Sequence, residues 1–327
     1  MNFLLEPFGR LVDEELTNVM YNSVKLDAIY IPSLSQRYFD AKKIFLLKKY
    51  ARNIVFLYSN DFKVSPIISS MSRVENIYNY YDFVKWYTSR TENRNIGIQW
   101  RESFDIPHKR SFALADARMH GYRYIMLLDD DLTLVEKNLE IGIMALQLVA
   151  DVVGFHVIDY PDVSTIDHLE RKILNAENTI SMTGSCLLLN MDKVAGDFPN
   201  IYNEDLFFFL AQPDQTKVVS AGKIYQDEYS PWLDIKRVCH EQFGDLIYDA
   251  IKKKLVKNEI GKIIWEEEID DRIERITRIK MQAKEKTQVL ALDNAIEVLN
   301  SIQVKNIMDF INNYSFSEFV RNSFFAI

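Results

Sequence analysis

Five short apolar runs are the feature that most constrains the fold of this chain. Each run is rich in β-branched or aromatic side chains, and most are nearly continuous rather than alternating. Such runs are typical of strands covered on both faces, as in a mainly parallel sheet. The runs are residues 26–34, 53–61, 94–100, 122–131 and 150–159.

The segments between the first four runs are long enough for crossover helices. Residues 35–51 and 108–121 supply two of these helices, and the second ends at Gly121, a residue that commonly stops a helix. The N-terminal part is therefore predicted to be an α/β sandwich with a mainly parallel sheet.

Beyond about residue 240 the composition changes to long, charged helical stretches. An apolar stripe there needs a partner, which is the N-terminal domain, the next helix or a second copy of the chain. The aromatic segment 314–327 docks on the protein's own core or lies on a membrane surface. We predict a domain at 1–240 and a helical extension at 241–327. The stripe comprises Trp265, Ile269, Ile273, Ile276 and Ile279.

Charge and cysteine content restrict the class of protein. The 327 residues carry a formal net charge of −8, which argues against a nucleic-acid-coating protein. The two cysteines, Cys186 and Cys239, form no paired motif and favour a reducing compartment. No signal peptide or membrane-spanning run is recognisable, so we expect a cytoplasmic protein, with peripheral contact at the inner face of the membrane as the alternative.

Polar residues follow several of the predicted strands. In open α/β sheets, ligands bind beyond the carboxyl ends of the strands. If the aspartate triplet continues the fourth strand, Asp129 and Asp131 project to one side, where two carboxylates favour Mg²⁺ or Mn²⁺. A solvated turn or helix cap is the alternative. The strand-end residues are Pro32, Ser33, Ser59, Asp61, Asp129, Asp130 and Asp131.

The segment 107–132, PHKRSFALADARMHGYRYIMLLDDDL, resembles glycosyltransferases of the GT-A fold, particularly those similar to family 2. The shared features are a basic helix start, a GY break, and an apolar strand closed by a DXD motif. The resemblance implies that Asp129, Asp130 and Asp131 hold a divalent cation on the diphosphate of a nucleotide sugar, with Asp129 near the ribose.

A second match to the same family lies at residues 181–210. A small-residue strand containing Gly184 precedes an acidic pair, Glu204 and Asp205, that opens a helix. The resemblance implies that Asp205 is the general base for the acceptor hydroxyl, and that Glu204 binds the acceptor or orients the helix. The alternative is that the pair only stabilises the helix start through its dipole.

Four further residues are candidates with structural alternatives. By the resemblance, His240 completes the metal shell; otherwise it is a surface or interface histidine. Lys109 or Arg110 neutralises a phosphate, or lies at a solvated helix start. Trp232 covers the sugar or acceptor, or is a packed core residue.

These observations predict a metal-dependent glycosyltransferase that uses a nucleotide-diphosphate sugar and inverts the anomeric centre. The acceptor is a glycan, a lipid-linked sugar, a peptide or a small molecule. Three alternatives remain open: a retaining GT-A enzyme, a nucleotidyltransferase, and a non-catalytic nucleotide-sugar-binding module. The segment after the first strand, IPSLSQR, lacks the glycines usual in nucleotidyltransferases.

Overall fold

The computed structural model describes residues 10–11, 25–33, 41–58, 66–76, 105–158, 160, 163–176, 182–226, 228–257 and 259–325. The predicted strand 94–100 and the predicted site residues Ser59 and Asp61 lie outside these ranges. The described strands form one nine-stranded sheet. They are β1 (Arg10–Leu11), β2 (Leu26–Ser33), β3 (Ala51–Tyr58), β4 (Arg73–Asn76), β5 (Tyr124–Leu128), β6 (Leu132–Thr133), β7 (Val152–Ile158), β8 (Met182–Asn190) and β9 (Val218–Gln226).

The sheet is mainly parallel, with the order β1-β9-β7-β8-β5-β2-β3-β4. Strand β8 is antiparallel to both β5 and β7, and the short β6 pairs antiparallel with β9. Strands β2 and β5 are parallel neighbours in which Ala28 lies opposite Ile125 and Tyr30 opposite Leu127. The carboxyl ends of β2 and β5 therefore meet at one edge of the sheet.

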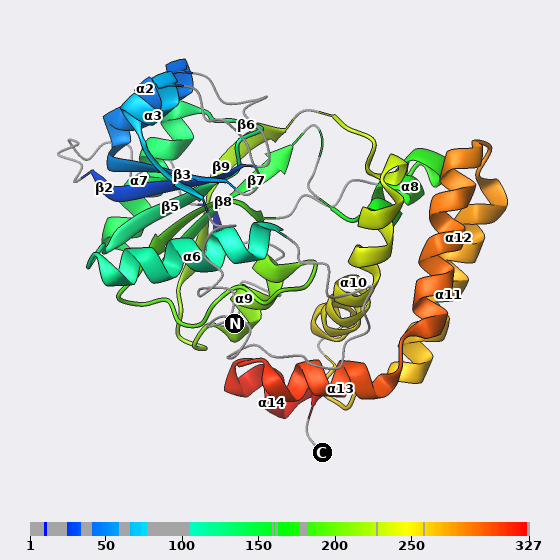
Figure 1. The fold of residues 1–327 in the computed structure, drawn as a ribbon. Helices are drawn as coiled ribbons and strands as arrows, with labels where there is room; N and C mark the ends of the chain where they lie inside the picture. Colours follow the sequence, from blue (N-terminus) through cyan, green and yellow to red (C-terminus); the bar gives the residue numbers. More distant parts are fainter. Residues whose placement is uncertain are drawn as a thin grey trace.

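Helices cover both faces of the sheet (Figure 1). On one face Ile29 and Ile31 join a core with α2, α3 and α7; on the other, Ala28 and Tyr30 join a core with α6 and α9. The alternation of strand side chains between the two cores explains why the strand sequences are apolar throughout. These helices are α2 (Ala41–Tyr50), α3 (Pro66–Met71), α6 (Asp105–Met119), α7 (Glu136–Leu148) and α9 (Glu204–Ala211).

The remaining helices build a second body beside the sheet, and α13 and α14 turn back beneath it towards α9 (Figure 1). The predicted apolar stripe is confirmed, because Trp265, Ile276 and Ile279 are buried in the core of this body. The aromatic tail also docks there, with Phe316 and Phe324 buried. These elements are α8 (Thr165–Leu174), the 3₁₀ helix η4 (Pro231–Leu233), α10 (Ile235–Val256), α11 (Trp265–Gln282), α12 (Lys286–Ser301), α13 (Val304–Asn313) and α14 (Glu318–Phe324).

The division between the domain and the extension remains a prediction. The expected boundary after residue 240 falls inside α10, a continuous helix whose N-cap Asp234 accepts a hydrogen bond from the Arg237 amide. The predicted α/β class, with a mainly parallel sheet sandwiched by helices and a C-terminal helical extension, is confirmed. Among the described helices, none combines the length and apolarity needed to cross a membrane.

Candidate active site

Ser33 and Asp130 meet where β2 and β5 end. The Ser33 hydroxyl donates a hydrogen bond to Oδ2 of Asp130. Lys43 Nζ, from α2, donates to the Asp130 carbonyl oxygen over 3.3 Å. Burial raises the pKa of the Asp130 carboxyl to about 6; the Ser33 hydrogen bond lowers it, and the charge of Asp131 raises it further. A cation bound here would favour the ionised form of Asp130.

The aspartate triplet forms a turn between β5 and β6 and does not continue the strand. The predicted alternation of side chains is therefore wrong, because it requires an extended backbone. Asp129 contacts Arg110 on α6, whereas Oδ2 of Asp131 accepts a hydrogen bond from Gln226 Nε2 at the end of β9, 3.1 Å away. The three carboxylates reach three different elements of the fold.

Arg110 links the aspartate triplet to the acidic pair on α9. Its Nη2 lies 3.0 Å from Oδ2 of Asp129, and its Nη1 lies 2.5 Å from Oε1 of Glu204. The Arg110 side chain is 4% exposed and the Glu204 side chain 10%. A guanidinium between two carboxylates in this setting strongly restrains all three groups. The two sequence motifs are thus joined into one site.

Asp205 is fixed by the backbone at the start of α9. Its Oδ1 accepts from the Leu206 amide over 2.8 Å, and its Oδ2 accepts from the Gly184 amide on β8. A Cβ at residue 184 would lie 2.5 Å from Asp205 Cβ and 2.6 Å from Arg110 Nη1. Glycine at this position therefore allows β8, α6 and α9 to approach one another.

The structure places Lys109 and Trp232 differently from the prediction. Lys109 is fully buried, and its Nζ donates to the Ser33 carbonyl over 2.7 Å, so it holds the end of β2 and is not open to a phosphate. Trp232 is 4% exposed and belongs to the core of the helical body, with Lys172 Nζ 4.5 Å from its ring centroid. The alternative of a packed core residue is therefore correct for Trp232.

The metal role of His240 stays a prediction. The residue lies on α10, and the described residues contain no group of three His, Cys, Asp or Glu side chains placed to hold a metal. The donors at the sheet edge are nevertheless hard oxygens, the class that Mg²⁺ and Mn²⁺ prefer. Beside Asp131, Oε1 of Gln226 is buried with no hydrogen-bond partner. The chemistry of the aspartate edge thus fits a divalent cation, with oxygens of a ligand completing its shell.

Several residues at this edge were not predicted from the sequence. Gln226 was missed because β9 was not predicted, although its segment VVSAGKIYQ has the β-branched content of a strand. Tyr160, His168 and Tyr229 form an aromatic cluster just beyond the ends of β7 and β9, with the Tyr160 and His168 rings stacked at 4.3 Å. These three residues come from distant segments, so no sequence motif connects them.

Comparison with known proteins found no matching family model and no matching curated protein. Among solved structures, the chain is similar to the glucosyl-3-phosphoglycerate synthase of M. tuberculosis, with 10% identity, 68% of this chain and 78% of that chain covered, and a TM-score of 0.43. A putative nucleotide-diphospho-sugar transferase from Desulfovibrio desulfuricans G20 has 9% identity, covers 64% of this chain and 84% of its own, and gives a TM-score of 0.37.

A third similar structure is the 4-diphosphocytidyl-2C-methyl-D-erythritol synthase of Anaerococcus prevotii DSM 20548. It has 12% identity, covers 63% of this chain and 90% of its own, and gives a TM-score of 0.31. At this level of similarity the function must be argued from the residues of the chain itself.

Proposed function

We propose that this chain is a metal-dependent glycosyltransferase that moves a sugar from a nucleotide-diphosphate sugar to an acceptor hydroxyl with inversion. The observation that carries the proposal is the Arg110 bridge between Asp129 and Glu204. It places the DXD segment, which would bind the donor, beside the acidic pair, which would bind and activate the acceptor. A glycosyl transfer requires these two functions side by side.

The donor would bind at the joined ends of β2 and β5. Ser33 and the buried Pro32 would contact the nucleoside, and Asp130, hydrogen-bonded to Ser33, would orient it. A divalent cation, Mn²⁺ or Mg²⁺, held by Asp129 and Asp131 would stabilise the charge that develops on the leaving diphosphate. Arg110 would hold the Asp129 carboxylate in position for this task.

Asp205 would accept the proton of the acceptor hydroxyl. Each of its oxygens accepts a backbone N–H, which fixes the carboxylate and leaves a second lone pair on each oxygen. Glu204 would orient the acceptor together with Arg110. The acceptor itself, a glycan, a lipid-linked sugar, a peptide or a small molecule, is set by contacts outside this network.

Donor binding is tested by thermal unfolding with a panel of nucleotide sugars, with and without Mn²⁺. A donor at 100 times its Kd should add about 2.7 kcal/mol to the free energy of unfolding. Asp131→Ala should abolish the Mn²⁺-dependent part, while Asp192→Ala, at an exposed surface ion pair, should not. Donor stabilisation that is independent of Mn²⁺ in the wild-type protein would remove the metal from the proposal.

The chemical step is tested by comparing Asp205→Asn with Glu204→Gln. Asp205→Asn should lower transfer roughly 10²- to 10⁴-fold at unchanged donor affinity, because an amide cannot accept the proton. Glu204→Gln should weaken acceptor use more than donor hydrolysis. Near wild-type transfer by Asp205→Asn would exclude it as the base, and a product with retained anomeric configuration, measured by NMR, would exclude inversion.

A further inference from the structure

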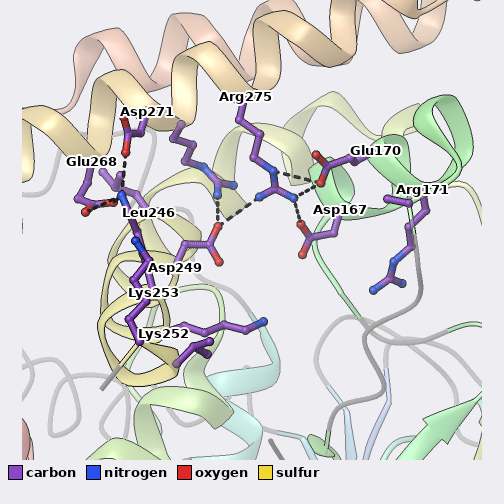
Figure 2. Close-up of a pocket in the computed structure, with 14 residues that line it drawn as sticks. Asp167, Glu170, Arg171, Leu246, Asp249, Lys252, Lys253, Glu268, Asp271 and Arg275 are labelled. Atoms are coloured by element: carbon purple, nitrogen blue, oxygen red, sulfur yellow. Dashed lines mark hydrogen bonds and ion pairs between the residues drawn. The ribbon is translucent and has the colours of Figure 1, made fainter. Parts of the chain in front are cut away.

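A cavity of about 480 Å³ lies in the helical body, among α8, α10 and α11. It shares no residue with the aspartate edge and has no part in the proposed transfer. Its volume lies within the range of small-molecule sites. Charged side chains dominate the lining, and Leu246 and Val256 add apolar surface (Figure 2).

The acidic side chains of the cavity are all engaged in ion pairs. Arg275 contacts Asp167, Glu170 and Asp249, which come from two different helices. Arg272 Nη1 lies 2.6 Å from Asp249. Lys253 lies 2.7 Å from Asp271 and 3.2 Å from Glu268. These pairs hold the three helices together around the cavity, and the five carboxylates of the lining share the three cations Lys253, Arg272 and Arg275.

Three basic side chains of the lining form no ion pair with a carboxylate of the described residues, although the charges of Asp167 and Glu170 act on Arg171. Arg171 on α8 and Lys252 on α10 extend towards the space between these helices (Figure 2), and Lys257 lies at the C-cap of α10. Within the described part of the chain, none of the three takes part in an ion pair, and Nη1 of Arg171 is buried with no hydrogen-bond partner. Burial lowers the pKa of the Arg171 guanidinium. Arg171 lines the cavity, so an anionic ligand there would lie beside a guanidinium whose donors are not all satisfied.

We infer that this cavity is a second binding site, which takes a small molecule carrying a phosphate monoester. A phosphate offers several oxygen acceptors and a charge near −2, which matches the donors of Arg171, Lys252 and Lys257. The rest of the ligand would pack on Leu246 and Val256. The ion pairs of Arg272 and Arg275 preorganise the walls, so the ligand does not have to order them.

The first test is isothermal titration of the full-length protein with glucose 6-phosphate in the presence of EDTA, which removes any cation-dependent binding at the aspartate edge. Saturable binding to wild type should weaken by about 10-fold in Arg171→Gln and again in the double variant with Lys252→Gln, since a hydrogen bond to a charged group contributes about 1.5 kcal/mol or more. Lys305→Gln, an exposed lysine on α13, makes the same charge change and should leave the affinity unchanged.

The folding of the variants is checked by their urea midpoints. Because Arg171 has a buried, unpaired donor and no carboxylate partner, Arg171→Gln should leave the midpoint unchanged or raised. A loss of binding therefore reports on the cavity. Equal affinity of wild type and the double variant would overturn the proposal.

A phosphate monoester can also belong to a lipid headgroup, and a second experiment separates the two sources. The protein is sedimented with phosphatidylcholine vesicles that contain phosphatidic acid. Retention that is lost in the double variant but kept in Lys305→Gln would identify a lipid phosphate at the same site. Glucose 6-phosphate binding without vesicle retention would identify a soluble ligand, and absence of both would reject the site.

Discussion

At the residue scale, the candidate active site depends on the placement of one guanidinium. Replacing Arg110 with Ala would leave Asp129 and Glu204 facing each other without the cation between them. We expect the free energy of unfolding to fall by about 3 kcal/mol, the typical loss when one partner of a buried pair is removed. Urea denaturation measures this change.

The control for Arg110 is on the same helix. Arg118 pairs with Asp197 over 3.1 Å, but its side chain is 39% exposed, so Arg118→Ala should cost less than about 1 kcal/mol. Equal losses in the two variants would show that Arg110 contributes no more than a surface pair.

His168 makes stability depend on pH. It is 5% exposed, with Nε2 buried and unpartnered, and burial lowers its pKa to about 3, with the charges of Arg171 and Arg237 acting in the same direction and Asp167 opposing them. In the unfolded chain this histidine therefore takes up a proton near pH 6.5, whereas in the folded chain it stays neutral until the pH is much lower. Stability is lost as the pH falls from about 6.5 towards 3.

The His168→Phe variant should lack this part of the pH dependence. Phenylalanine can keep the stacking on Tyr160 and cannot be protonated. Between pH 6.5 and pH 4.5 the wild type should lose about 2 to 3 kcal/mol relative to the variant, in a series of urea titrations. Parallel pH profiles for the two proteins would show that His168 has the same pKa in the folded and the unfolded chain.

At the element scale, the sequence predicts which segments form strands better than it predicts which strands lie side by side in the sheet. The apolar runs 26–34 and 122–131 correspond to β2 and β5, because burial on both faces leaves a composition that is readable locally. The sequence of β8 itself does not show that this strand lies antiparallel between β5 and β7, because the hydrogen-bond partners of a strand lie far away in the chain. At Asp129–Asp131 the structure has the turn that the sequence left as the alternative to a continued strand.

The contact between α10 and the start of α9 is set by a glycine. A Cβ at Gly244 would lie 2.0 Å from the Tyr202 carbonyl oxygen, which is backbone and cannot rotate away. Gly244→Ala should therefore push the helices apart and strain the nearby Asn203–Asp245 hydrogen bond of 2.8 Å. We expect a loss of about 3 kcal/mol, the upper end for overpacking.

Gly261 provides the matched glycine control. Its added Cβ would meet nothing within 4 Å, and its backbone is not in the left-handed region. Gly261→Ala should change the free energy of unfolding by less than about 1 kcal/mol, and any change should be stabilising. If Gly244→Ala unfolds at the same urea concentration as Gly261→Ala, the two helices are not in close contact in solution.

At the scale of the whole molecule, α9 makes the sheet and the helical body one folding unit. Phe208 and Phe209 lie in the core against the sheet, while Phe207 lies in the core of the helical body, 5.3 Å from the Phe310 ring. Only the tertiary structure shows that the faces of this helix belong to two cores. Unfolding either core would expose one face of α9, so we expect both to unfold together.

Phe207→Ala tests this coupling. Removing a fully buried phenylalanine should cost about 3 kcal/mol or more and speed the exchange of globally protected amides roughly 100-fold. Hydrogen exchange with mass spectrometry should show this acceleration in peptides from β5, on the far side of α9, as well as in α12. Leu290→Ala, at an exposed position on α12, should accelerate neither. Faster exchange in α12 alone would mean that the helical body unfolds independently, and that the sheet with its aspartate edge stays folded without it.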